Sequence, residues 1–126
     1  MKKVLFLVAL VLMSAGTFAQ KKNVSRAKNL ALMEENPDFA NARVAIGEAL
    51  ENEETKGLAD TWYVAGLIGY REAFMERIFR TGNVEKIGRD VLESINYWLK
   101  ADEMAMTPVY DKKGRPKYNT RVRRDI

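Results

Sequence analysis

The stretch "TWYVAGLIGY", residues 61–70, decides the fold of this chain, because it reads as a helix that carries two glycines. A glycine inside a helix costs roughly 1 kcal/mol relative to alanine. Gly66 and Gly69 follow the bulky Trp62 and Tyr63 within this one segment. A helix that keeps such glycines gains close packing in return, because a residue without a Cβ lets a partner helix approach the backbone. The sequence therefore predicts a helix that lies tightly against a neighbouring helix.

The two glycines are not expected to be equivalent. The predicted helix has a small side and a bulky side, formed by Ala65, Gly66 and Gly69 and by Trp62, Leu67 and Ile68. Small side chains on one helix accommodate large ones from the next. We expect Gly66→Leu to unfold this helical hairpin and Gly69→Ala to be mild.

Further helices are predicted on both sides of this stretch. Apolar residues recur there at spacings of three and four, which indicates amphipathic helices. Asn36 and Pro37 are residue types preferred at an N-cap and at the first helical position, and Asn83 after Gly82 marks a second boundary. The expected helices cover about residues 24–33, 37–52, 58–79 and 84–105.

The fourth helix has the clearest amphipathic pattern. Its apolar stripe consists of Val84, Ile87, Val91, Ile95 and Trp98, widened by Leu92 and Leu99. Its charged side carries Glu85, Lys86, Arg89, Asp90, Glu93 and Lys100. A helix of a globular protein turns such a stripe toward the core. We therefore expect the stripe to be buried and the charged side to face solvent.

The predicted fold class is all-α, because no segment after residue 20 alternates with a period of two for more than a few positions. Four helices make two antiparallel helical hairpins, which either close as a bundle or stack as repeats. Residues 109–126 have two interpretations. In the first, two short runs that flank "DKKGRP" pair as a small hairpin. We favour a basic connector there, or the start of a further helix near Asn119, which is too short to be stable alone.

Positive charge is concentrated in the last sixteen residues. Residues 111–126 hold seven Lys or Arg against Asp111 and Asp125, whereas residues 20–110 hold twelve against fifteen acidic residues. A slightly acidic body makes nucleic-acid binding unexpected. The basic tail is instead a candidate for contact with an anionic polymer or a membrane surface.

The first 19 residues predict a cleaved signal peptide rather than a membrane anchor. Lys2 and Lys3 precede an apolar run over residues 4–13, and small residues follow as far as Ala19. A spanning helix needs about 20 apolar residues, and Ser14 interrupts this run early. The chain has no cysteine, so a lipid-anchored signal and disulfides are excluded. We expect export to the periplasm or cell envelope of a Gram-negative bacterium.

Common catalytic and metal-binding chemistry is excluded by composition. The chain has no His and no Cys, so it lacks the usual general base, the thiolate nucleophile and every common zinc ligand except carboxylates. The adjacent pairs Glu34-Glu35 and Glu53-Glu54 are the remaining candidates, but neighbouring residues on a helix do not face each other. We expect no enzyme activity, no metal and no cofactor.

Several spacings resemble the tetratricopeptide repeat. In that family a Trp is followed by Leu-Gly and Tyr, and the second helix carries Ala-x3-Phe before a Pro. The matching positions are Trp62, Ala65, Gly66, Ser94, Trp98, Ala101 and Pro108, with Ala42, Ile46 and Ala49 as the second helix of a preceding unit. The chain thus resembles a divergent, exported bacterial tetratricopeptide-repeat protein over residues 24–108. Sixteen additional residues between Trp62 and Ser94 require longer third and fourth helices.

The resemblance implies an α-solenoid fragment whose groove binds a protein or peptide. Family spacing places Tyr63, Leu67, Tyr70 and Arg71 on the groove. Two tyrosines offer rigid amphipathic contact area, and an arginine offers a fork for a carboxylate. The alternatives are that these residues pack against the next helix, or that Trp62 and Trp98 belong to the core of an ordinary bundle. Repeat stacks need about three units, so we expect either further repeats in a longer parent chain or a homo-oligomer.

Overall fold

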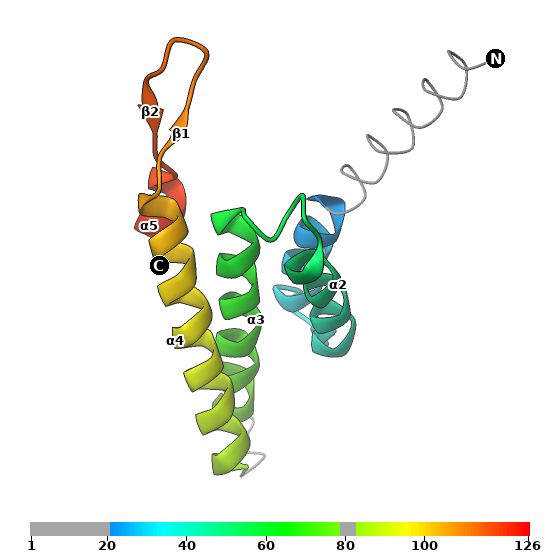
Figure 1. Ribbon diagram of the computed structural model, residues 1–126. Helices are drawn as coiled ribbons and strands as arrows, with labels where there is room; N and C mark the ends of the chain where they lie inside the picture. The colour runs from blue at the N-terminus through cyan, green and yellow to red at the C-terminus, as the bar shows by residue number, and fades with distance from the viewer. Residues whose placement is uncertain (1–20, 79–82) are drawn as a thin grey trace, which may run out of the picture.

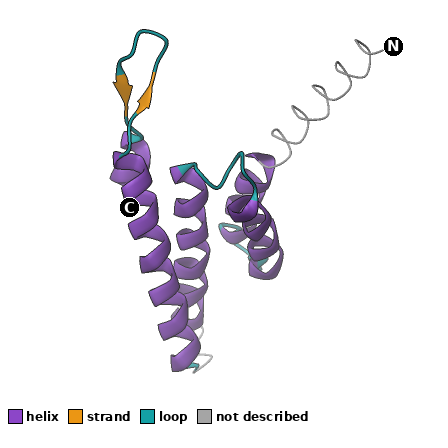
Figure 2. Cartoon of the chain, viewed as in Figure 1, coloured by secondary structure: helices purple, strands orange, loops and turns teal. Residues whose placement is uncertain are grey.

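The computed structural model describes residues 21–78 and 83–126, and these residues form an all-α fold that carries a small β-hairpin (Figures 1 and 2). A first helix over residues 21–31 precedes α2 (Phe39–Glu51), α3 (Ala59–Ile78) and α4 (Val84–Met106). Two strands, β1 (Val109–Tyr110) and β2 (Pro116–Lys117), then lead to α5 (Thr120–Asp125). The predicted signal peptide and Gly82 lie outside the described residues. Within the described ranges, no helix combines the length and apolarity needed to cross a membrane.

The four predicted helices are present, but one predicted start is wrong. α2 begins at Phe39 rather than Pro37, because the Asp38 side chain accepts a hydrogen bond of 3.1 Å from the Asn41 amide. Asn36 has a φ of 48° and forms the turn before the helix. The predicted cap at Asn83 is confirmed, since its side chain accepts from the Lys86 amide at 3.0 Å. Asn36 and Asp38 are both residue types suited to an N-cap. The residue that caps α2 is Asp38, which directly precedes the first apolar residue of the helix, Phe39.

The close packing predicted from the glycines is confirmed, and it joins α3 to α4. A Cβ built on Gly66 would lie 2.4 Å from Cδ1 of Trp98, and one on Gly69 would lie 2.7 Å from Oγ of Ser94. The second Cβ would also lie 3.0 Å from the carbonyl oxygen of Asp90. The expectation that Gly69→Ala is mild is therefore wrong, because a backbone atom of a packed helix cannot move aside as a flexible side chain can.

The predicted orientation of α4 is also wrong. The residues of α4 that are buried are Asp90, Ser94, Ala101 and Ala105. The large apolar residues Val84, Leu92 and Leu99 are 77%, 63% and 65% exposed, respectively. α4 thus turns Asp90, Ser94, Ala101 and Ala105 toward α3 and places the ring of Trp98 over Gly66, while Val84, Leu92 and Leu99 remain exposed.

The core contains few large side chains and forms two clusters. The cluster between the first helix, α2 and α3 includes Ala27, Ala31, Ala42, Ala45, Ile46, Ala49, Val64, Ala65 and Ile68. The cluster between α3, α4 and α5 consists of Ala59, Ala101, Ala105 and Val122. α3 contributes to both clusters and is therefore the central helix, as Figure 1 shows.

Residues 109–126 form a hairpin and a helix, so the favoured connector is wrong for the hairpin segment, whereas the predicted start of a further helix near Asn119 is confirmed. Val109 pairs with Lys117 and Tyr110 with Pro116. Asp111 closes the turn, since its Oδ1 accepts from the amides of Lys113 and Arg115, both at 2.9 Å. These hydrogen bonds, first that from the Arg115 amide, outweigh slight desolvation and lower the pKa of Asp111.

α5 is held by tertiary contacts, because six residues are too few for a stable isolated helix. Asn119 caps it by accepting from the Val122 amide at 3.1 Å. The Val122 side chain is 1% exposed and packs against Ala101 and Ala105 of α4. The side chain of Arg123 pairs with Asp102 of α4 at 3.3 Å. α5 therefore has a defined position beside the start of α3 and the end of α4.

We expect Gly66→Ala to lower the free energy of unfolding by about 1–3 kcal/mol, because the added methyl group overlaps the Trp98 ring. The matched control is Gly47→Ala in α2, where a Cβ meets nothing within 4 Å. There the substitution should stabilise by about 0.5–1 kcal/mol through helix propensity. Urea denaturation followed by circular dichroism measures both, and equal effects would contradict the packing described for α3 and α4.

Candidate functional site

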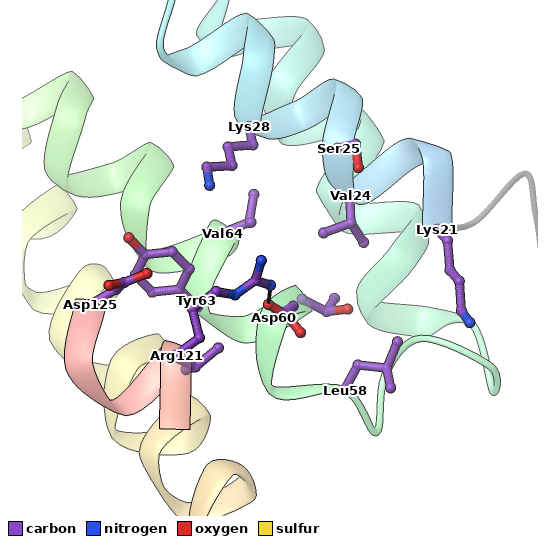
Figure 3. A pocket seen from close by; sticks show the side chains of 12 residues that line it. Lys21, Val24, Ser25, Lys28, Leu58, Asp60, Tyr63, Val64, Arg121 and Asp125 are labelled. Carbon is purple, nitrogen blue, oxygen red and sulfur yellow. Dashed lines mark hydrogen bonds and ion pairs between the residues drawn. The ribbon is translucent and has the colours of Figure 1, made fainter. Parts of the chain in front are cut away.

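A cleft of about 450 Å³ lies between three helices that are distant in sequence (Figure 3). The first helix contributes Lys21, Val24, Ser25 and Lys28, the segment at the start of α3 contributes Leu58, Asp60, Thr61, Tyr63 and Val64, and α5 contributes Arg121, Val122 and Asp125. Its walls therefore mix aliphatic, aromatic and charged side chains. A cleft of this size accommodates a short segment of another chain.

The wall formed by α3 and α5 is fixed by polar contacts. Asp60 accepts a hydrogen bond from Nδ2 of Asn119 at 3.1 Å and forms an ion pair with Arg121. Asn119 also caps α5, so one side chain both starts α5 and ties it to α3. The position of this wall thus depends on Asp60 and on the buried Val122.

Some charged side chains of the cleft have an ion-pair partner and others do not. Arg121 is already paired with Asp60, whereas Lys21 and Lys28 are exposed on the first helix and form no ion pair with any residue that the structure describes. In Figure 3 the Lys28 side chain points toward the side where Tyr63 and Arg121 lie. The first helix therefore offers two cations to a ligand that occupies the cleft.

Two polar groups beside these cations are also suited to recognition. Burial raises the pKa of Tyr63, and the charge of Asp125 raises it further while Arg121 opposes it, so its hydroxyl stays protonated at neutral pH. The hydroxyl of the fully buried Thr61 has no hydrogen-bond partner among the described residues. A buried polar group without a partner costs roughly 1–3 kcal/mol. The cleft thus combines a phenol, an unpaired hydroxyl and two lysines.

Of the four residues that the family spacing places on a groove, only Tyr63 lines this cleft. Tyr70 packs on Trp98 with ring centroids 5.6 Å apart, and it also stacks with Phe74 at 6.4 Å. The Arg71 guanidinium lies 5.9 Å from the centre of the Phe74 ring. Leu67 is half-buried and lies outside the lining of the cleft. The structure therefore separates Tyr63 from an aromatic group farther along α3.

The residues that carry the family resemblance serve the packing of α3. Nε1 of Trp62 donates to the Lys56 carbonyl at 2.7 Å, and the Trp62 ring lies 5.9 Å from that of Tyr97. Nε1 of Trp98 donates to the Tyr63 carbonyl at 3.1 Å. The remaining motif residues, Ala65, Gly66, Ser94 and Ala101, are buried in helix contacts.

A cluster of ionic side chains, which sequence reasoning missed, joins α2, α3 and α4. Arg43 of α2 pairs with Glu72, Asp90 and Glu93 at 2.7, 3.2 and 2.6 Å. Lys86 pairs with Glu72 at 2.7 Å and with Asp90 at 3.1 Å. Only the Lys86–Asp90 pair, four residues apart on α4, has a local pattern in the sequence, and the contacts between helices depend on how α2, α3 and α4 pack.

The pKa shifts in this cluster follow from its contacts. Burial acts to raise the pKa of Glu72, but hydrogen bonds from Lys86 and Arg43 outweigh it and hold the pKa below its ordinary value. Burial acts to lower the pKa of Arg43, but Glu93 and Glu72 outweigh it and raise it. Glu72 and Arg43 therefore stay ionised at neutral pH, and the cluster is suited to holding helices together rather than to moving protons.

The carboxylate pairs considered for catalysis lie apart from the cleft. Glu34, Glu35, Glu53 and Glu54 are exposed, and Glu53 pairs with Lys56 at 2.6 Å. The described residues contain no group of three or more acidic side chains placed to hold a metal ion. Neither Glu-Glu pair thus forms part of an enclosed site.

No protein-family model, curated protein or solved structure matches this chain. The protein is therefore classified by its structure alone. It is an all-α protein of antiparallel helices with a cationic cleft at one end.

The ionic cluster predicts a specific response to acid. Arg43→Leu should lower the free energy of unfolding by roughly 1–3 kcal/mol at neutral pH, because three carboxylates lose a shared cation. The lowered pKa of Glu72 contributes stability above its ordinary value of 4.5, and this contribution is lost as the pH falls through the lowered value. The variant should therefore lose less stability on acidification below pH 4.5 than the parent chain does.

Urea denaturation at a series of pH values measures both effects. The exposed Arg26 provides the control, because Arg26→Leu removes the same charge from the first helix and should change the unfolding free energy little. Parallel pH profiles for Arg43→Leu and the parent chain would show that the cluster does not stabilise the fold.

Proposed function

We propose that this chain is an exported, non-enzymatic scaffold of the tetratricopeptide-repeat type that binds an extended, acidic protein segment in the cleft. The observation that carries the proposal is which helices line the cleft. The first helix and α3 are the leading helices of successive hairpins, and α5 follows α4 in the place where the leading helix of a third unit would begin. A groove lined by leading helices is the arrangement that the resemblance implies.

The chemistry of the cleft supports an acidic ligand. Lys21 and Lys28 lack acidic partners among the described residues, whereas Asp60 is neutralised by Arg121. Tyr63 adds a rigid ring with a hydroxyl, and Val24 and Val64 add apolar surface. An extended segment carrying two or more carboxylates, or a free chain terminus, would meet the cations while its backbone meets the hydroxyl of Tyr63.

A second candidate function rests on the hairpin. It exposes Lys112, Lys113 and Lys117, whereas Arg115, Arg121 and Arg123 of the same basic segment are paired with Asp111, Asp60 and Asp102. Three clustered lysines at a projecting hairpin are suited to an anionic envelope polymer or membrane surface. This would make the protein a small envelope-surface protein, with the helices as a support.

Binding to synthetic acidic peptides tests the first proposal, with tryptophan fluorescence as the readout because Trp62 adjoins the cleft residues Thr61 and Tyr63. Lys21→Glu/Lys28→Glu should weaken binding at least about tenfold without unfolding the chain, because both side chains are exposed. The matched control, Lys112→Glu/Lys113→Glu on the hairpin, should leave the affinity unchanged.

The opposite pattern would favour the second candidate. If the hairpin variant alone loses binding, and if the parent chain sediments with vesicles containing anionic lipid in a salt-sensitive manner, then the basic hairpin is the working surface. If neither acidic peptides nor anionic vesicles bind the parent chain, both proposals fail.

A further inference from the structure

The side of α4 that faces away from α3 carries an unusual amount of exposed apolar surface. We define the outer stripe as Val84, Val91, Leu92, Ile95, Leu99 and Met106, which are between 39% and 77% exposed. Figure 1 shows α4 at the edge of the molecule, with α3 between it and α2. Contiguous apolar patches on a monomer's surface commonly mark an interaction site.

Four residues of the outer stripe have the spacing of a coiled-coil seam, and Gly88 and Asp102 occupy the neighbouring seam positions. Leu92, Leu99 and Met106 are seven residues apart, and Ile95 lies three residues after Leu92. Seams of this kind bind a second helix along its length. α4 has 23 residues and is about 34 Å long, which is enough for three heptads.

The charges beside the stripe select the partner and its direction. Arg89, Asn96 and Glu103 are exposed and are also spaced by seven residues, with Asn96 midway between the two charged side chains. If a second α4 runs antiparallel with Asn96 opposite its own counterpart, each Arg89 lies opposite Glu103 of the second copy. The same register places Leu99 within two residues, or about 3 Å along the axis, of Ile95 of the second copy. A parallel pair would instead place Arg89 and Glu103 beside apolar positions and leave the charges unmatched.

Both charged side chains are available for such a contact. Arg89 forms no ion pair with any residue in the described ranges, in contrast to Arg43 and Lys86 of the ionic cluster. Glu103 has only an exposed contact with Lys100 of its own helix, at 3.5 Å. Exposed pairs of this type contribute little. No stronger contact within the chain therefore competes with the intermolecular pairs.

We propose that the outer stripe binds the same stripe of a second copy of this chain, in an antiparallel arrangement with a two-fold axis at Asn96. A two-fold interface is self-complementary, so each Arg89–Glu103 contact occurs twice. Trp98 lies one position before Leu99, and Tyr70 and Phe74 of α3 stack beside it with exposures of 48% and 41%. These rings extend the apolar surface from α4 onto α3. The dimer leaves the cleft at the first helix and α5 unused, so it is independent of the proposed function.

Single cysteines test the geometry, because the chain contains none of its own. The protein is expressed from its full sequence so that any processing takes its natural course. Asn96→Cys should form a disulfide-linked dimer under mild oxidation, since the axis brings the two copies of this position together. Leu92→Cys is the matched control on the same stripe. In the antiparallel register the two copies of position 92 lie about 12 Å apart along the axis and should not cross-link.

Charge reversal tests the pairing in solution. Sedimentation equilibrium should show a dimer for the parent chain, and Arg89→Glu should raise its dissociation constant roughly tenfold by placing like charges opposite each other twice. The double variant Arg89→Glu/Glu103→Arg should restore the parent affinity. Lys28→Glu, which makes the same charge change on the first helix, should leave dimerisation unchanged, and circular dichroism verifies that each variant is folded.

Three results would overturn the proposal. The parent chain sediments as a monomer at every concentration tested, or Leu92→Cys cross-links while Asn96→Cys does not, or the folded double variant fails to regain the affinity lost in Arg89→Glu. The second of these would indicate a parallel pair, and the third would show that Arg89 and Glu103 do not meet across the interface.

Discussion

The close approach of α3 and α4 at Gly66 and Gly69 is the contact on which the remaining structure depends. The indole of Trp98 lies over Gly66, and its N–H reaches the Tyr63 carbonyl at 3.1 Å. At this distance Ser94 lies against Gly69. The rotation of α4 that these contacts require also brings Asp90 to the ionic cluster and presents Ala101 and Ala105 to Val122. One pair of glycines thus positions α4, and α4 in turn positions α5 and one wall of the cleft.

A core built from alanines has an energetic consequence. A buried methylene or methyl group contributes about 0.8 kcal/mol, so an alanine-rich core gains less from hydrophobic burial than a leucine-rich one of equal length. Contacts between polar groups on different helices therefore carry a larger share of the specificity. Arg43 is the clearest case, because a single guanidinium contacts α3 and α4 from α2. Asp60 has the corresponding role at the other end of α3, where it holds Asn119 and Arg121.

The parts of the structure that the sequence predicts are those with local causes. The helices are predicted by apolar periodicity, and the cap at Asn83 is predicted by its residue type. The α3–α4 contact is indicated by two glycines, because glycine is unfavourable inside a helix unless it permits close packing. The hairpin is harder to predict from the sequence, because strands of two residues are too short to show an alternating pattern. Gly114 is a residue type typical of turns, and in the structure its φ is 76°. The cleft could not be predicted as a whole. It joins Lys28, Tyr63 and Arg121, whose proximity depends on how three helices pack.

The orientation of α4 shows why its clear amphipathic pattern predicts the wrong buried face. The amphipathic rule assigns the apolar stripe to the core because burial of large apolar side chains usually outweighs other terms. Here Trp98 and Ser94 are the side chains of α4 that pack on the glycines of α3, and the rotation of α4 that this requires leaves Leu92 and Leu99 exposed in the single chain. A buried leucine is worth about 1.5–3 kcal/mol relative to an exposed one. A second copy that covers Leu92 and Leu99 would supply apolar burial that the alanine core lacks, and for this reason the packing inside the chain and the proposed interface have the same physical origin.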